Sequence, residues 1–241
     1  MSSYAQHHRR ARHPAQRSRS RGHNPLAAPL LLFAAVGIVA MGYVAYVLWP
    51  RWPDAPVTTD APSLPVVIAG VTFNIEPAAI RAAVQRRPGT QERVDLDYLW
   101  PSLDPPNLAA KPTLAALPNA DDRLFVTIAS GAATLPIADR ARDIYPRYFA
   151  AALGTGPAGL TVRPFRDDTP YQGEDLVFET KAPEHFLARC ARHGVTNHGT
   201  CMLERRIGEA DLTFRFPRDW LSDWGAVAAG IDKLLARLHP N

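Results

Sequence analysis

An uncharged apolar run from Leu26 to Trp49 constrains the fold of this chain more than any other feature. Its 24 residues would form a helix about 36 Å long, which is enough to cross a hydrocarbon core about 30 Å thick with some tilt. We therefore predict a single transmembrane helix over residues 26–49, with the remaining chain divided between the two sides of a membrane.

Two other interpretations of this run stay open at the level of sequence. A cleavable signal peptide has an apolar core of about 7–15 residues followed by a small-residue cleavage site, and the buried core helix of a soluble protein can also be apolar. The run here is longer and leads into Tyr46, Trp49 and Trp52, whose rings suit a membrane interface better than a peptidase site. We favour a signal anchor that stays attached to the protein.

Positive charge lies mainly on one side of the run. Six arginines and no acidic residue precede it, namely Arg9, Arg10, Arg12, Arg17, Arg19 and Arg21. On the other side, Arg51 is soon followed by Asp54. Because cationic flanks stay in the cytoplasm, the sequence predicts a bacterial inner-membrane protein with a cytoplasmic N-terminus and a periplasmic C-terminal domain.

Residues 1–25 are poor in apolar side chains and rich in arginine and serine, so we predict a disordered basic cytoplasmic tail. This tail can contact anionic lipid headgroups or nucleic acid, or it can serve only to set the topology. The formal net charge of +4 belongs to the tail, because residues 54–241 hold 20 basic and 23 acidic residues. We therefore expect the lipid bilayer as a partner, and no nucleic acid on the folded part.

A proline-rich segment follows the predicted transmembrane helix. Residues 50–65 include Pro53, Pro56, Pro62 and Pro65, which favour a semi-extended linker that holds the next domain away from the membrane. Residues 66–241 are numerous enough to form one domain with a core of its own. The predicted order is therefore tail, transmembrane helix, linker and periplasmic domain.

Hydrophobic periodicity predicts an α+β fold for this domain, with a largely antiparallel sheet packed by two or three helices. We expect helices over residues 77–84, 137–153 with a kink or break at Pro146, and about 217–238, where the apolar stripe is clearest. Strands are expected over residues 66–75 (one strand or a hairpin), 94–100, 124–129, 160–165, 175–179, 185–190, 202–207 and 211–216, the last two as a hairpin. Residues 101–121 are rich in proline and predict a long surface loop.

The two cysteines are the most specific chemical feature of the sequence. Cys190 and Cys201 flank a ten-residue connection between predicted strands and lie outside the cytoplasm in this topology, which favours a disulfide. The spacing Cys190-x2-His193-x4-His198-x2-Cys201 also offers the ligand types of a structural zinc site, although in an atypical order. Free or intermolecular thiols are a third alternative. We expect the disulfide, and neither a metal nor a cofactor.

A polar loop with one aromatic side chain is the best candidate for a recognition surface. We assign a binding role to Tyr171, Gln172, Glu174 and Asp175 in this loop, because an aromatic ring among polar groups is suited to contacts with a partner. The alternative interpretation is an ordinary solvated hairpin turn, in which such residues bond to the local backbone.

The sequence holds no recognisable catalytic pattern. It lacks GxSxG, HExxH, P-loop and GxGxxG motifs. Carboxylates are frequent, at Asp95, Asp97, Asp104, Asp167, Asp168, Glu174 and Asp175, and most of them fall in predicted turns. Two of them could still serve as the acid and base of a hydrolase, because the separation that this chemistry needs is set by the fold.

Several longer strings of the sequence resemble a family. VTFNIEPAAIRAAVQRRPGTQERVDLDYLWPSL, DRLFVTI, IYPRY, PYQGEDL and RFPRDWLSDW are similar to segments of an uncharacterised bacterial family of small membrane-anchored proteins. The resemblance extends over most of residues 66–240. It implies a single-pass anchor with a periplasmic domain, and it implies no reaction or catalytic residue.

We therefore expect a membrane-anchored module that acts by binding, with another envelope protein as its partner. The alternative is a periplasmic envelope hydrolase that uses two of the carboxylates named above. A deep cleft that collects these carboxylates would favour the hydrolase, whereas carboxylates scattered over the surface would count against it.

Overall fold

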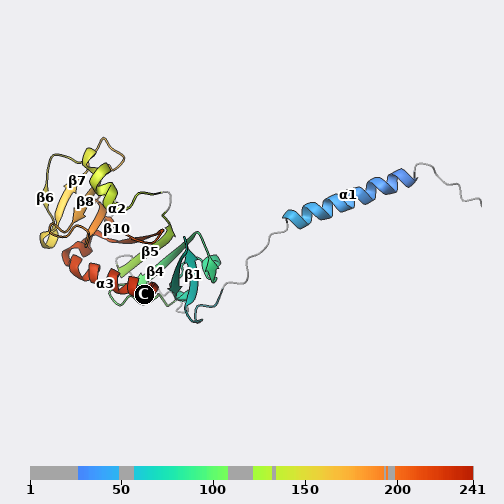
Figure 1. Ribbon diagram of the computed structural model, residues 1–241, viewed down its shortest axis with the longest axis horizontal. Coiled ribbons are helices and arrows are strands. Elements are labelled where there is room, and N and C mark those ends of the chain that lie inside the picture. The colour runs from blue at the N-terminus through green and yellow to red at the C-terminus, as the bar shows by residue number, and fades with distance from the viewer. Residues whose placement is uncertain are drawn as a thin grey trace, which may run out of the picture. The chain divides into compact units, whose positions relative to one another are not determined.

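The computed structural model describes residues 27–48, 57–107, 122–131, 134–192, 194 and 199–240 of the 241-residue chain (Figure 1). The chain separates into two compact units, Met1–Trp52 and Pro53–Asn241, and each is considered by itself. The predicted tail of residues 1–25 lies outside the described residues, as do residues 108–121 of the predicted surface loop.

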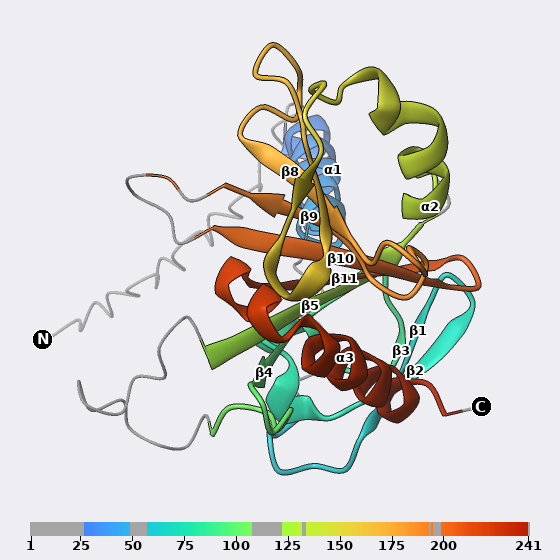
Figure 2. The ribbon, with the colours of Figure 1, turned by 90° about the vertical axis from the view of Figure 1, so that its left-hand side faces the viewer.

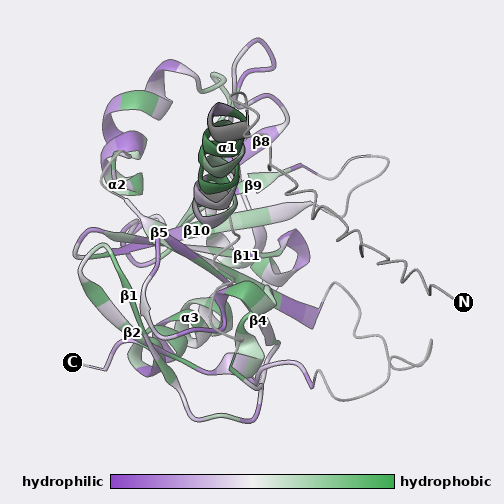
Figure 3. Ribbon diagram, turned by 90° about the vertical axis from the view of Figure 1, so that its right-hand side faces the viewer, coloured by the Kyte–Doolittle hydropathy of each residue, from purple (hydrophilic) through white to green (hydrophobic). Residues whose placement is uncertain are grey.

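Helix α1, Ala27–Leu48, is the described element of the first unit. It carries no charged residue, and its segment Pro29–Tyr46 is long and apolar enough to cross a membrane. None of that segment is buried within the protein, and Figure 3 shows hydrophobic colouring on several turns of the helix. A helix that is apolar all round and unburied suits lipid better than water. The observed bounds agree with the predicted transmembrane helix to within one residue at each end.

The second unit is built on an eight-stranded sheet in which every pair of neighbouring strands is antiparallel. The order across the sheet is β4 (Arg93–Leu99), β5 (Arg123–Ser130), β11 (Ala210–Pro217), β10 (Thr200–Ile207), β9 (Leu187–Ala191), β8 (Glu174–Phe178), β7 (Thr161–Pro164) and β6 (Gly154–Thr155). This arrangement confirms the predicted α+β fold with its antiparallel sheet, and it confirms the hairpin of β10 and β11.

A smaller three-stranded sheet begins the domain. β1 (Leu64–Ile68) and β2 (Val71–Ile75) form an antiparallel hairpin, and β3 (Gly89–Thr90) pairs with β1 in parallel. Ala69 and Gly70 have positive φ angles of 50° and 79°, which fits a tight two-residue turn between the strands. Of the two forms predicted for residues 66–75, the hairpin is the one observed.

One face of the large sheet is covered by α3 (Trp224–Leu238), which follows the 3₁₀ turn η7 (Arg218–Asp223) (Figure 2). We call this the α3 face. Val227, Ala228, Ile231, Leu234 and Leu238 are buried there with alternate side chains of the strands, as the predicted apolar stripe requires. A β-carbon at Gly230 would lie 2.6 Å from the Trp100 ring, so a glycine allows this indole to pack directly on the helix.

The opposite face carries a helical segment over β8, β9 and β10, and we call it the α2 face. The segment consists of α2 (Ile137–Asp139), the π-helical turn η4 (Arg140–Ile144) and the 3₁₀ turn η5 (Tyr145–Arg147). The prediction of a helix to residue 153 is wrong in its second half. After Pro146 the chain turns extended, and Phe149 forms an isolated bridge with Phe165.

The predicted helix over residues 77–84 is also wrong. Two 3₁₀ turns take its place, η1 (Pro77–Ala79) and η2 (Ala83–Gln85), and another, η6 (Pro157–Gly159), occurs later in the chain. Ile80 between the first two turns is extended, with ψ of 117°, and bridges to Leu96 of β4. Its side chain is fully buried. Burial of Ile80 beside the sheet therefore overrides the local helical preference of the alanines.

Candidate ligand-binding pocket

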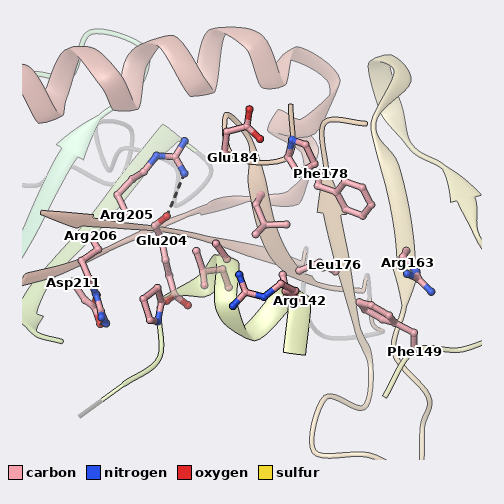
Figure 4. Close-up of a pocket in the computed structure, with 16 residues that line it drawn as sticks. Arg142, Phe149, Arg163, Leu176, Phe178, Glu184, Glu204, Arg205, Arg206 and Asp211 are labelled. Carbon is pink, nitrogen blue, oxygen red and sulfur yellow. Dashed lines mark hydrogen bonds and ion pairs between the residues drawn. The ribbon is translucent and has the colours of Figure 1, made fainter. Parts of the chain in front are cut away.

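A pocket of about 530 Å³ lies on the α2 face, between the helical segment and the sheet (Figure 4). Its size falls within the range of small-molecule sites in proteins. Most of its lining is apolar, with Ile137, Ala138, Ala141, Phe149, Leu176, Phe178 and Leu187 among the side chains. The pocket is therefore suited to a ligand with a sizeable apolar part.

The floor of this pocket is formed by those side chains of β8 and β9 that point to the α2 face, since successive side chains of a strand point to opposite faces. In β8, Leu176 and Phe178 belong to the α2 face, whereas Val177 between them is buried in the core of the α3 face. In β9, Leu187 points to the α2 face and Ala188 to the other. The sheet therefore presents one apolar layer to α3 and a second, smaller one to the pocket.

The wall opposite the floor is a π-helical turn. η4 contributes Ala141 and Arg142 to the lining. π-Helical turns are rare and occur frequently at functional sites. Arg142 is 69% exposed and is bonded to Asp139 and Asp143 on its own helical segment, so its guanidinium lies on the open side of the wall.

Ion pairs hold two of the three acidic side chains of the lining, and the third, Glu184, is exposed. Glu204 of β10 pairs with Arg140, whose guanidinium also donates to the Tyr145 hydroxyl at 3.1 Å. Asp211 of β11 accepts two hydrogen bonds from Arg206, at 2.6 and 2.9 Å. Both carboxylates are thus neutralised by arginines, which leaves them poorly suited to act as a general base.

The Asp211 carboxylate has a third donor, the Thr134 hydroxyl at 2.6 Å. A β-carbon at Gly131 would lie 2.6 Å from this carboxylate, so the glycine makes room for it. Burial by itself would raise the pKa of Asp211, but the hydrogen bonds from Arg206 and Thr134 outweigh burial and hold the pKa below its ordinary value. The charged form of Asp211 therefore contributes to stability.

Replacing Asp211 with asparagine is expected to lower the free energy of unfolding at pH 7 by roughly 1–3 kcal/mol. Because the pKa is depressed in the folded state, this contribution is present above the ordinary value of 3.8 and is lost as the pH falls through the folded-state pKa. Chemical denaturation at pH 7 and pH 3 should show the deficit at pH 7 and a smaller one at pH 3. Glu209→Gln, in the exposed turn beside it, is the control; an equal loss for both variants at both pH values would contradict the assignment.

Arg163 of β7 differs from the other arginines of the pocket. Its guanidinium carbon lies 4.2 Å from the centre of the Phe149 ring, a stacking geometry that fixes its orientation. Its Nε atom is buried and has no hydrogen-bond partner within the described part of the protein. Because its guanidinium has no ion pair with an acidic residue in that part either, this end of the pocket is suited to an anionic group supplied by a ligand.

The four residues of the predicted recognition loop differ in their burial and in their contacts. Asp175 is 5% exposed and pairs with two arginines, Glu174 pairs with Arg189 at 2.8 Å, and Gln172 is exposed. The Tyr171 ring packs 4.8 Å from that of Phe165 in the aromatic cluster of the α2 face. Recognition by this loop stays a prediction, and its exposed part is confined to the tip.

The cysteines lie opposite each other on neighbouring strands. Cys190 of β9 and Cys201 of β10 are register partners, and their sulfur atoms are 1.97 Å apart, at bonding distance. Both side chains are fully buried on the α3 face. His193 and His198, the other members of the zinc alternative, lie outside the described residues.

The carboxylates proposed for a hydrolase are not collected in this pocket. Asp95 is bonded to Arg93 and Thr127, and Asp97 is bonded to Arg123; both belong to β4, at the edge of the sheet away from β8 and β9. Burial raises the pKa of Asp97 and outweighs the effect of Arg123. None of the seven carboxylates named from the sequence lines the pocket. This pocket therefore does not bring together the carboxylates that the hydrolase alternative would use.

The sequence did not point to the pocket residues. Phe149 and Arg163 are fourteen positions apart and meet only because the chain after Pro146 returns along β7. The one usable signal was the apolar spacing of Ile137 and Ala141, from which the sequence predicted a helix and no pocket.

Comparison with known proteins yields only distant similarities. No protein-family model matches the chain, and neither does any curated protein. The structure of Smlt3025, an immunity protein of the Stenotrophomonas maltophilia type IV secretion system, aligns at a TM-score of 0.48 and 14% identity over 78% of this chain and 96% of that one. The Neisseria meningitidis iron-regulated outer membrane lipoprotein FrpD aligns at 0.45 and 11% identity over 77% and 96%. TM-scores and sequence identities this low give no information about the roles of individual residues in this protein.

Proposed function

We propose that this protein is a single-pass inner-membrane protein whose periplasmic domain is a binding module of the cell envelope, with the pocket on the α2 face as its binding site. The observation that carries the proposal is the composition of the pocket. Its walls are mostly apolar, and two of its three carboxylates, Glu204 and Asp211, are held in ion pairs, while the third, Glu184, is exposed. Such a site is suited to recognition of a ligand with an apolar part, and the two paired carboxylates are poorly suited to acid–base catalysis.

The anchor is supported by α1 and the charges around it. α1 is uncharged and unburied, and six arginines precede it within residues 1–25. A cationic N-terminal flank favours a cytoplasmic tail and leaves the domain that follows α1 in the periplasm. A short connection to the membrane would keep the pocket at a high effective concentration of envelope ligands and partners.

Site-specific photocrosslinking in cells tests the binding role. A benzophenone amino acid in place of Arg142, on the open wall of the pocket, is expected to give light-dependent adducts with a defined ligand or envelope protein. The same amino acid in place of Lys233, exposed on α3, is the matched control. Adducts that are equal in yield and kind at the two positions would contradict a binding site on the α2 face.

A further inference from the structure

We infer that the pocket on the α2 face accepts a single-chain anionic amphiphile, a long-chain carboxylate, with its chain along Phe149, Leu176 and Phe178 and its headgroup at Arg163. This inference rests on the proposed binding function and adds the class of ligand. It follows from three features of the described residues: the apolar walls, an arginine without an acidic partner, and a floor without free backbone groups.

The apolar walls account for the chain of the ligand. Leu176, Phe178 and Leu187 form the floor, while Ile137 and Ala141 face them from the helical segment. Each methylene group moved from water into such surroundings strengthens binding about fourfold. Affinity should therefore rise with chain length until the volume of about 530 Å³ is filled.

Charge in the lining accounts for the headgroup. Of the other lining arginines, Arg206 pairs with Asp211, Arg142 pairs with Asp139 and Asp143, and Arg205 donates to the backbone carbonyls of His185 and Glu204. The lining carboxylate Glu204 pairs with Arg140, and Glu184 is exposed. Arg163 has no acidic group within ion-pair distance among the described residues, and its buried Nε lacks an acceptor. A carboxylate beside the Arg163 guanidinium would supply the missing negative charge. The Phe149 ring, stacked on the guanidinium, lies next to the place where the chain would start.

The backbone of the floor argues against an extended peptide as the ligand. β8 is hydrogen-bonded to β7 and β9, and β9 is bonded to β8 and β10. The floor is therefore the face of a sheet and not an open edge. A peptide could not add a strand here, and its own amide groups would meet mainly apolar side chains. An acyl chain has no such groups to satisfy.

Photoaffinity labelling of the full-length protein in phosphatidylcholine nanodiscs tests this assignment. A dodecanoate probe with a diazirine near its methyl end is compared with the corresponding alcohol, and labelled peptides are mapped by mass spectrometry. Both probes should label α1, which serves as an internal standard. The carboxylate probe should label peptides from residues 137–149 and 174–187 about tenfold more than the alcohol does, and unlabelled dodecanoate should compete.

Variants identify the residue that recognises the charge. Arg163→Gln is expected to bring the two probes to equal labelling of the pocket while alcohol labelling persists, which shows that the variant is folded. Arg87→Gln, the same change at an exposed arginine outside the pocket, should keep the tenfold preference. Ala141→Trp should reduce pocket labelling by both probes, because the indole would occupy the pocket.

Equal labelling by the two probes in the unaltered protein would overturn the inference, and so would an unchanged preference in Arg163→Gln. Displacement of the adduct by an apolar peptide with a free C-terminal carboxylate, but not by dodecanoate, would assign the pocket to a protein partner instead. In that case the adducts specific to position 142 would still stand, and the binding function with them. Loss of those position-specific adducts would instead remove the binding function itself.

Discussion

Replacing Asp175 with alanine is expected to lower the free energy of unfolding by about 3–5 kcal/mol, because it leaves Arg218 without its counter-ion inside the domain and leaves Arg192 with only its longer ion pair to Asp167. Asp175 bonds to Arg192 at 2.8 Å and to Arg218 at 2.6 Å. The side chains are 7% exposed for Asp175, 36% for Arg192 and 17% for Arg218. Most of the expected loss comes from Arg218, since water can reach Arg192 more easily.

These two arginines also donate hydrogen bonds to the surrounding backbone. Arg192 donates to the carbonyl oxygens of Phe165 and Glu174, at 2.7 and 3.2 Å. Arg218 donates to those of Cys190 and Ala191, at 3.3 and 3.2 Å. Asp175 therefore anchors a network that joins β8, the end of β9 and the end of β11, and its loss should loosen all three together.

Chemical denaturation of the full-length protein in detergent, followed by circular dichroism, measures the effect. Asp168→Ala is the matched control, since Asp168 is 76% exposed and its ion pair with Arg166 spans 3.1 Å at the surface. We expect this variant to lose at most about 0.5 kcal/mol. Similar losses for Asp168→Ala and Asp175→Ala would refute a structural role specific to the buried pair.

The strands were predictable because their signals are local. In β11, buried and partly exposed side chains alternate over all eight residues, and β10, across a two-residue turn, alternates in its first half, where Cys201 and Leu203 are buried. In α3, the apolar residues recur at helical spacing from Val227 to Leu238. Both patterns arise because each element buries one face, and the spacing of apolar residues in the sequence follows directly from that.

The two wrongly predicted helices and the unpredicted pocket have a common cause, which is dependence on contacts between distant parts of the chain. Ile80 leaves its predicted helix to bridge to Leu96, and Phe149 leaves its helix to bridge to Phe165. Each choice depends on a partner sixteen residues away, which local propensity does not contain. The pocket depends on the same long-range contacts, since its wall and floor meet only after the sheet has formed. The sequence likewise placed Asp175 at the end of the predicted recognition loop and gave no sign of its arginine partners, which are 17 and 43 positions away.

Removing the disulfide is expected to lower the free energy of unfolding by about 3 kcal/mol, because the bond between Cys190 and Cys201 closes a short loop and restricts the unfolded chain. The two residues are eleven positions apart and both fully buried. The double variant Cys190→Ala and Cys201→Ala keeps small apolar groups at both positions, so the loss should come mainly from the missing bond. Reductant should destabilise the unaltered protein by a similar amount and leave the double variant unchanged.

The same bond tests the proposed orientation in the membrane, because disulfides persist in the periplasm and are rare in the cytoplasm. Protein from whole cells, denatured in a mass-adding maleimide, should be modified only after reduction, and a non-reducing gel should show a monomer. This outcome would support oxidised cysteines joined within one chain and a domain outside the cytoplasm. If both thiols react without reductant, the disulfide is not formed in the cell. A cytoplasmic domain then becomes the first explanation to examine, and zinc binding by Cys190 and Cys201 the second.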